Sequence, residues 1–240
     1  YCENNLIRFY SVPHVRNYIK RQLQLELLGE VPVLSIRTEP LQNPVNRLAK
    51  RLFDLTFSSL FLLTIFPFIY LFVGLIIKIS SPGPIFFKQE RNGKNGKIFK
   101  CYKFRSMKVN ALSDSLQATK NDPRKTKFGN FLRKSNLDEL PQFINVFKGE
   151  MSIVGPRPHM LKHTEEYSQL INKYMMRHLV KPGITGWAQV TGYRGETKEL
   201  SQMEGRVRRD LWYIENWTFL LDIRIMIKTV TNMFRGEKNA

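Results

Sequence analysis

An uncharged run of 23 residues, Leu55 to Ile77, limits the folds open to this chain more than any other segment. A helix rises about 1.5 Å per residue, so a helix of this length would span the core of a bilayer. An ordinary membrane-spanning helix is therefore the default interpretation. Pro67, however, lies at the middle of the run, where its ring and its missing N–H would kink a helix.

Positive charge flanks this run on both sides. A helix that crosses the membrane once shows its basic bias on the cytoplasmic side only. We therefore expect a re-entrant membrane segment over residues 50–79, in which two short helices enter one leaflet and return, with the break at Pro67. Thr64 is a candidate to hydrogen-bond the backbone that the break leaves free. The flanking basic residues are Arg47, Lys50 and Arg51 before the run and Lys78, Lys88, Arg91, Lys94 and Lys97 after it.

The overall composition indicates an anionic partner. The chain of 240 residues carries 38 Lys and Arg against 20 Asp and Glu, a formal net charge of +18. This excess favours nucleic acid, an anionic membrane leaflet or a phosphorylated substrate, and charge alone does not choose among them. Cys2 and Cys101 are far apart and in no metal-type spacing, so neither a disulfide framework nor a zinc site is expected.

The first part of the chain differs from the rest. We expect residues 1–46 to be the tail of a preceding domain plus a linker, and residues 47–240 to form the main domain. Val31 to Ile36 is a candidate strand, and two X-Pro pairs at Pro40 and Pro44 mark the linker. The chain begins with Tyr1 rather than Met, as expected for a piece of a longer protein.

Two adjacent carboxylates, Asp138 and Glu139, lie in the segment FLRKSNLDELPQFINVFKGEMSIVGPRP. Proline fits the first turn of a helix and breaks its interior, so Pro141 places the two acids at a helix N-terminus. One explanation is a capped helix start, with Ser135 or Asn136 as the N-cap.

The other explanation of the carboxylate pair is a ligand site. Free backbone N–H groups and the positive end of the helix dipole attract phosphate to a helix start. Arg133 and Arg157 lie on either side of the pair and supply further positive charge.

A β-hairpin is predicted by IFFKQERNGKNGKIFKCYKFRSM, with its turn at Asn92 to Gly96. Lys103 and Arg105 at the end of its second strand are candidate phosphate contacts, and a solvated basic face is the alternative.

The C-terminal third predicts helices and one glycine-rich loop. Residues 159–178 predict an amphipathic helix, whose histidines we expect to be surface or core residues rather than ligands. Residues 180–195 form either a loop that approaches a phosphate, with Arg194 as an anion contact, or a tight structural loop. The segment from Asp210 onward is aromatic, apolar and basic, as in helices that lie in membrane interfaces, and an ordinary core helix is the alternative.

Five motifs in this order resemble the bacterial sugar transferase family of monotopic polyprenyl-phosphate phosphoglycosyl transferases. The resemblance covers about residues 44–236, and the piece before it is similar to the end of the domain that precedes the catalytic part in the longer members. It implies an α+β, mainly helical fold with a membrane-dipping helix–break–helix, a small β-hairpin and interfacial amphipathic helices around a cytoplasmic active site. The motifs are KRLFDLTFSSLFLLTIFPF, SPGPIFFKQERNGKNGKIFKCYKFRSM, LRKSNLDELPQFINVFKGEMSIVGPRP, KPGITGWAQVTGYRG and DLWYIENWTFLLDI.

The resemblance implies a reaction and a place. A sugar 1-phosphate would pass from a UDP-sugar to undecaprenyl (polyprenyl) phosphate with release of UMP, as a first membrane step of exopolysaccharide, capsule, O-antigen or other glycan assembly. The catalytic domain would lie on the cytoplasmic face of the bacterial inner membrane, against anionic lipid. No nucleic-acid partner is expected, and the fuller-length members suggest a homodimer.

The resemblance also assigns roles to residues. Asp138 matches the nucleophile, which would form an aspartyl phosphosugar, and Glu139 matches a ligand of Mg²⁺. The substrate phosphates would be bound by Arg133, Arg157, Arg194, Lys103 and Arg105.

One motif departs from the family pattern. Where the helix break in the family is commonly Ser-Pro, this chain has Phe66-Pro67, so the depth and angle of the membrane dip are not predicted. A second hypothesis is a membrane-tethered polyanion-binding protein, and a third is a scaffold without catalysis. The sequence does not predict which sugar is moved.

Overall fold

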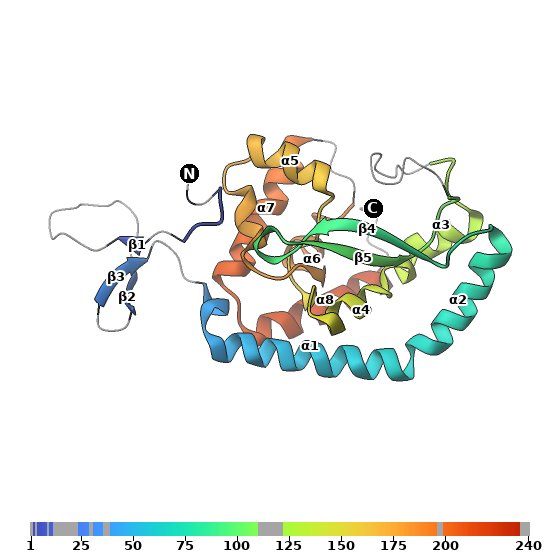
Figure 1. Cartoon of the computed structure of the whole chain (residues 1–240), viewed down its shortest axis with the longest axis horizontal. Helices are drawn as coiled ribbons and strands as arrows, with labels where there is room; N and C mark the ends of the chain where they lie inside the picture. Colours follow the sequence, from blue (N-terminus) through green and yellow to red (C-terminus); the bar gives the residue numbers. More distant parts are fainter. Residues whose placement is uncertain are drawn as a thin grey trace.

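The computed structural model describes residues 2, 4–8, 10–11, 24–28, 31–35, 39–109, 122–195 and 199–235. Helices form most of the body and surround a long β-hairpin, and a bent helix pair runs along one side of it (Figure 1). A small N-terminal sheet lies apart from this body at the left of the same view. The mainly helical α+β prediction is confirmed.

The N-terminal sheet consists of β1 (Tyr10–Ser11), β2 (Gln24–Leu28) and β3 (Val31–Ser35), which pair antiparallel in the order β1-β3-β2. The strand predicted from residue 31 is therefore confirmed. The short 3₁₀ helix η1 (Pro40–Gln42) follows it.

The long helix α1 (Pro44–Thr64) begins inside the predicted linker, three residues before the predicted domain boundary at 47. Pro44 takes the first helical position, where its missing N–H costs nothing. The Asn43 side chain accepts a hydrogen bond from the Val45 N–H at 2.9 Å and caps the helix. The X-Pro pair that suggested a linker is thus a helix start.

A break at Ile65 separates α1 from α2 (Phe66–Ser80), and the two helices are bent by 56°. The predicted helix–break–helix is present, although its break lies two residues before Pro67. Pro67 has no N–H for the Leu63 carbonyl and its ring crowds that carbonyl, so the helix bends in the preceding turn. The Thr64 hydroxyl donates to the Leu60 carbonyl at 2.7 Å rather than to the carbonyl that Pro67 leaves free.

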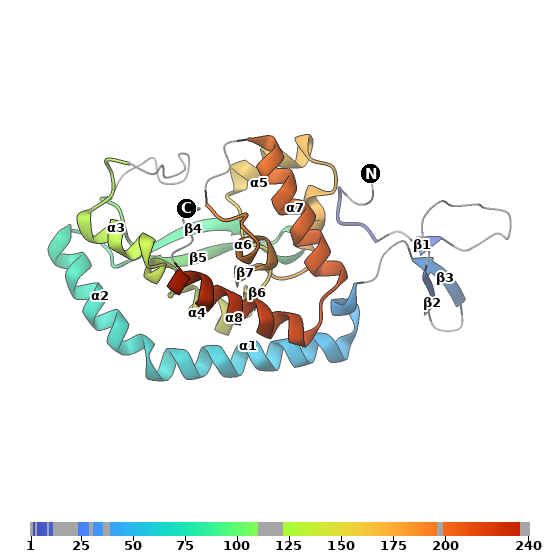
Figure 2. The same ribbon diagram turned by 180° about the vertical axis from the view of Figure 1, so that it is seen from behind.

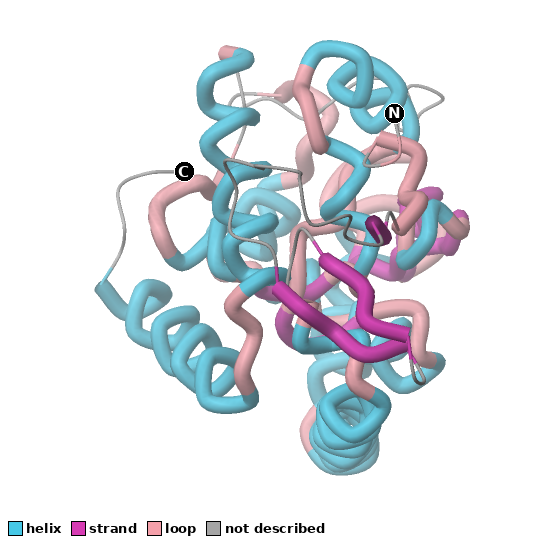
Figure 3. The backbone as a smooth tube through the Cα atoms, turned by 90° about the vertical axis from the view of Figure 1, so that its left-hand side faces the viewer, coloured by secondary structure: helices cyan, strands magenta, loops and turns pink. Residues whose placement is uncertain are grey.

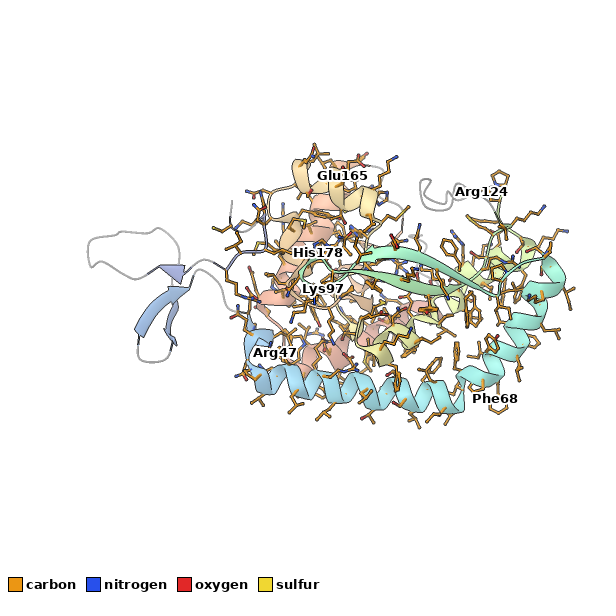
Figure 4. The ribbon with its side chains drawn as sticks, viewed as in Figure 1. Arg47, Phe68, Lys97, Arg124, Glu165 and His178 are labelled. Carbon is orange, nitrogen blue, oxygen red and sulfur yellow. The ribbon has the colours of Figure 1, made fainter. Side chains whose placement is uncertain are left out.

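The bent pair carries an apolar outer face. Among the described residues, no single helix is long and apolar enough to cross a membrane, whereas the bent pair together meets that criterion. Phe68 at the bend projects away from the body and is 75% exposed (Figure 4), and the pair lies at the lower edge of the molecule when seen nearly end-on (Figure 3). Other exposed apolar side chains of the pair are Leu48, Leu52, Phe57, Leu60, Leu63, Ile65, Leu71, Phe72, Leu75 and Ile79.

The predicted β-hairpin is confirmed. β4 (Phe86–Asn92) and β5 (Ile98–Phe104) pair antiparallel around the 3₁₀ turn η2 (Lys94–Gly96). Phe99 and Cys101 turn one face of β5 into the main core, where α4 packs against it. Phe104 instead packs into a second core with α2 and α3.

The chain then forms α3 (Lys127–Lys134), the 3₁₀ turn η3 (Leu137–Glu139) and α4 (Gln142–Lys148). Two short strands, β6 (Ser152–Val154) and β7 (Gly183–Thr185), pair in parallel although about thirty residues separate them. The body is completed by α6 (Trp187–Val190), α7 (Leu200–Glu215) and α8 (Phe219–Arg235), and α8 lies beside α1 and α4 when viewed from behind (Figure 2).

The single helix predicted over residues 159–178 is wrong. The structure has α5 (Leu161–Leu170) and a 3₁₀ helix, η4 (Tyr174–Leu179), with Ile171 extended and Lys173 in the left-handed region between them. The interruption turns Ile171 and Tyr174 into a small core with α7. In a continuous helix these two side chains would not both point into that core.

Candidate active site

A cavity of about 500 Å³ lies between the β-hairpin, α3, η3, and the loops that follow β6 and α6. Segments that are far apart in the sequence therefore contribute to one wall. All seven residues that the sequence proposed as catalytic or substrate-binding line this cavity: Lys103, Arg105, Arg133, Asp138, Glu139, Arg157 and Arg194.

The two carboxylates lie in η3, one turn before α4. Ser135 ends α3, and its hydroxyl donates back to the Phe131 carbonyl at 2.8 Å. Asn136 takes the N-cap position of η3 with φ of 59°; its backbone carbonyl accepts from the Glu139 N–H at 3.2 Å, whereas its side-chain oxygen accepts from Arg194. The predicted cap position is therefore present at Asn136, but neither candidate side chain caps the helix start.

Glu139 is the anchored member of the pair. Its Oε1 accepts hydrogen bonds from Lys103 Nζ at 2.7 Å and from Arg157 Nη2, and its Oε2 accepts from Arg157 Nη1 at 3.0 Å. Burial alone would raise the pKa of Glu139, but the charges of Arg157 and Lys103 outweigh it and hold that pKa well below its usual range. Glu139 is thus a fixed anion that holds two cations in the cavity.

Asp138 has the opposite environment. It is only 7% exposed, and no donor in the described ranges hydrogen-bonds to its carboxylate. Burial raises its pKa to about 6, with Lys103 opposing the shift and the neighbouring charge of Glu139 adding to it. A buried, unpaired carboxylate beside several cations is poorly solvated, which is how a protein makes such a group reactive.

Close backbone packing fixes Arg157. A Cβ on Gly183 would lie 2.1 Å from the Gly155 nitrogen, and one on Gly186 would lie 2.2 Å from the Gly155 carbonyl oxygen. The glycine-rich stretch thus lets β7 press against the chain just before Arg157. Of the two interpretations of that stretch, these two glycines fit the structural one. The Arg157 carbonyl also accepts a hydrogen bond from Arg177 Nη2 at 2.8 Å.

The other predicted anion contacts differ in what holds them. Arg133 Nε donates to the Ser106 hydroxyl at 2.8 Å, and Arg194 contacts Asn136 beside the carboxylate pair. Arg105 donates from both terminal nitrogens to the Ser81 and Pro82 carbonyls, each at 2.7 Å. These contacts join the end of α2 to the hairpin, and its buried Nε has no partner among the described residues.

Several cavity residues escaped the sequence analysis. Arg91, Arg206 and His159 line the same cavity, and Arg177 lies directly behind His159. The one local signal was the spacing of two residues between Arg157 and His159. It could have indicated that His159 lies near the same cavity. Trp187, by contrast, stacks on Trp212 with ring centroids 5.0 Å apart and is not among the residues that line the cavity.

The described residues of the cavity form no preformed metal centre, but one carboxylate there has an acceptor position that a magnesium ion could use. No group of three or more His, Cys, Asp or Glu in the described part of the chain could hold a metal. A carboxylate offers about four acceptor positions, and Glu139 uses three of them, so one remains on Oε2. Mg²⁺ commonly binds one or two carboxylates together with substrate phosphates. Glu139 and Asp138 can supply the carboxylates.

Comparison with known proteins shows the family of the chain. A family model described as bacterial sugar transferase matches residues 45–236. The UDP-glucose:undecaprenyl-phosphate glucose-1-phosphate transferase of Escherichia coli (strain K12) is 52% identical over 229 residues, which cover 95% of this chain and 48% of that protein. The protein of the same name from Xanthomonas campestris pv. campestris is 48% identical over 236 residues, with the same coverage.

A shorter relative matches over nearly its whole length. The exopolysaccharide production protein PSS of Rhizobium leguminosarum bv. phaseoli is 46% identical over 194 residues, which cover 78% of this chain and 96% of that protein. The chain spans about half the length of the two longer relatives. Because the family model covers most of the chain, including the whole cavity, the chain belongs to the bacterial sugar transferase family.

Proposed function

We propose that this chain transfers a sugar 1-phosphate from a UDP-sugar to undecaprenyl phosphate and releases UMP. The observation that carries the proposal is the pairing of an unbonded, buried Asp138 with an anchored Glu139 in a cavity rich in arginine. Family membership and the printed names of the E. coli and X. campestris relatives support the same reaction.

In the first step, an Asp138 carboxylate oxygen attacks the sugar-linked phosphorus of the UDP-sugar. A new P–O bond to Asp138 forms as the bond to the bridging oxygen breaks, and UMP leaves with that oxygen. Lys103, Arg133 and Arg157 carry the positive charge that offsets repulsion between the carboxylate and the diphosphate. The product on the protein is an aspartyl phosphosugar.

In the second step, an oxygen of the lipid phosphate attacks the same phosphorus. The bond to Asp138 breaks, and the carboxylate returns to its starting state as the polyprenyl diphosphate sugar forms. One phosphoanhydride bond is lost and one is made over the two steps, so the exchange is expected to be close to reversible.

Magnesium belongs to this proposal as a partner of the diphosphate. Glu139 has one acceptor position left for it, and Asp138 lies next to it in sequence. When bound, the ion neutralises phosphate charge. The arginines of the cavity share this task without proton transfer, because their guanidinium groups stay charged at any working pH.

The apolar outer face of α1 and α2 supports membrane attachment. Exposed apolar patches of this size mark interaction surfaces, and α8 adds further exposed apolar side chains at Phe219, Leu220 and Ile227. We propose that the bent pair dips into the cytoplasmic leaflet and that nearby lysines and arginines hold anionic lipid at about 1 kcal/mol each. The active site would then lie at the depth of the lipid phosphate.

UMP release tests the proposal directly. Protein in nanodiscs with undecaprenyl phosphate and Mg²⁺ is incubated with a panel of UDP-sugars, with UDP-glucose tested first because the relatives are named for it. We expect UMP with at least one donor and a loss of at least about a thousandfold in Asp138→Asn. Release that survives in Asp138→Asn would contradict the assigned nucleophile. Absence of release with every donor would contradict the reaction.

A further inference from the structure

His159 is a buried side chain on the cavity wall that the proposed chemistry does not use. It is 5% exposed and follows Arg157 by two residues. Its Nδ1 lies 2.6 Å from the Tyr174 hydroxyl and in hydrogen-bond contact with Arg177 Nη1. Tyr174 and Arg177 are not among the residues that line the cavity, so the Nδ1 edge of the ring faces the protein interior.

Arg177 determines which ring nitrogen carries the proton. A guanidinium has only donors, so its contact with Nδ1 is a hydrogen bond only if Nδ1 accepts. Burial, together with the charges of Arg177 and Arg206, holds the pKa of His159 well below its usual range, and the ring is therefore neutral. In a neutral ring with an accepting Nδ1, the proton is on Nε2.

Among the described residues, the Nε2–H has no hydrogen-bond partner. It is buried, and no described residue lies within hydrogen-bonding distance of it. Arg177 cannot follow a ring movement easily, because its Nη2 donates to Asp210 at 2.7 Å and to the Arg157 carbonyl at 2.8 Å, and its Nε donates to Asp210 at 3.2 Å. A buried donor that is held in place without an acceptor costs stability, which a bound acceptor would restore.

The surroundings of His159 indicate what the acceptor is. Next to α2 the cavity is lined by Pro84, Phe86 and Phe104, whose apolar side chains suit a lipid chain, together with Arg105. His159 lies near Arg91 and Arg206 instead, and the positive charges of both act on it. The surroundings of His159 therefore suit an anionic group of the soluble substrate.

We propose that His159 binds the sugar donor, the UDP-sugar. This proposal rests on the proposed function. The Nε2–H of His159 donates a hydrogen bond to a phosphate oxygen of the UMP half of the UDP-sugar. Arg177 orients the ring and, through the Arg157 carbonyl, also supports the cation that holds Glu139. One buried arginine thus positions both the donor site and the catalytic pair.

Two substitutions at His159 distinguish the role of Nδ1 from the role of Nε2. In His159→Asn the side-chain oxygen can still accept from Arg177, but the Nε2 donor is lost. In His159→Gln an amide N–H₂ reaches the position of Nε2. The matched control is His178→Asn, because His178 is also a buried histidine and is not among the residues that line the cavity (Figure 4).

Binding of UMP and UDP-glucose is measured by calorimetry in an Asp138→Asn background, and KM for both substrates is measured in the otherwise unchanged protein. We expect His159→Asn to weaken UMP binding and raise KM for UDP-glucose about tenfold, with KM for undecaprenyl phosphate changed less than about twofold. His159→Gln is expected to keep UMP binding within about threefold of the parent, and His178→Asn to leave it unchanged.

Three results would overturn the proposal: unchanged UMP binding in His159→Asn, equal losses in the Asn and Gln variants, or an effect on the lipid KM alone. The ¹⁵N resonances of His159 give a reading that needs no substitution. They should show a protonated Nε2 that shifts on addition of UMP, and a protonated Nδ1 would also overturn it. If the unsubstituted protein binds UMP through His159 but releases none from any donor, the proposed function fails and the binding role stands.

Discussion

Asp222 and Glu139 are both buried carboxylates that are paired with a lysine, but the groups around them differ. Asp222 joins α1, α7 and α8, because it accepts hydrogen bonds from Lys50, from the Tyr213 hydroxyl at 2.8 Å and from Trp217 Nε1 at 3.0 Å. Lys50 is the cation that pairs with Asp222, and both carboxylate oxygens of Asp222 have a donor.

The hydrogen bonds around Glu139 are not complete in this way. Among the residues that the structure describes, Asp138 next to it has no donor, His159 Nε2 has no acceptor, and the cations that line the wall outnumber the two acids. Unpaired buried polar groups are costly, and on a cavity wall a bound ligand can complete them. The complete network holds the fold together, whereas the incomplete one is arranged to receive a substrate.

Breaking the complete network should give the largest loss of stability. Asp222→Ala removes the carboxylate that pairs with Lys50 and leaves three buried donors without their acceptor, and we expect the free energy of unfolding to fall by about 3–5 kcal/mol. Chemical denaturation in detergent measures it. The double variant Lys50→Met with Asp222→Leu removes both charges and should recover part of the loss. A fall of less than about 1 kcal/mol in the single variant would contradict the structural role.

Within the cavity, replacing Arg157, which pairs with Glu139, should affect catalysis more than stability. Arg157→Lys keeps the charge but cannot bond both carboxylate oxygens at once. We expect kcat/KM for UMP release to fall about 10- to 100-fold, which corresponds to about 1.4–2.7 kcal/mol of transition-state stabilisation. Steady-state kinetics on folded protein checks this. Unchanged kinetics would remove Arg157 from the mechanism.

The raised pKa of Asp138 predicts a pH dependence of the first step. The ionised carboxylate is the nucleophile, so single-turnover UMP release without lipid should rise about tenfold between pH 5 and pH 7.5 and level off above a midpoint near 6. A flat profile from pH 5 to 8 would contradict the assigned environment of Asp138.

The raised pKa of Asp138 also makes the stability of the protein depend on pH. A carboxyl group whose folded pKa lies above 3.8 contributes stability at low pH, and that contribution is lost as the pH rises through about 6. Asp138→Asn should therefore be more stable than the parent at pH 7.5, by up to about 3 kcal/mol, with the difference shrinking toward pH 4.

Arg105 provides the smallest expected effect and the sharpest contrast with Arg157. Its guanidinium holds two backbone carbonyls at the end of α2, so Arg105→Lys should lose one of these bonds and lower the melting temperature by about 2–4 °C. We expect KM for UDP-glucose to change less than about twofold. A tenfold rise in KM would instead restore Arg105 as a phosphate contact.

Local patterns predicted the parts of the fold that depend on near neighbours. The hairpin around Asn92 to Gly96 and the helix break near Pro67 follow from turn chemistry and from the missing N–H of proline. The carboxylate pair and its flanking arginines were visible as motifs. The prediction of one helix over 159–178 failed because a tertiary core, rather than local propensity, turns Ile171 inward.

Contacts between distant segments were the parts that the sequence could not supply. Arg177 reaches His159 and Asp210 across η4 and α7, and no spacing rule connects these residues. The glycines at 183 and 186 suggested a ligand loop as readily as a structural one, because both uses require the same missing side chain. Only the close approach to Gly155 distinguishes them.

The measurement that tests the central claim most directly is the intact mass of the protein after mixing with UDP-glucose and Mg²⁺ in the absence of lipid phosphate. The incomplete network predicts an increase of one hexose phosphate, one equivalent of UMP released, and loss of the adduct on addition of undecaprenyl phosphate. Peptide mapping should place the adduct on Asp138, and Asp138→Asn should show none. An adduct that persists in Asp138→Asn, or UMP that appears only when lipid is present, would contradict the account.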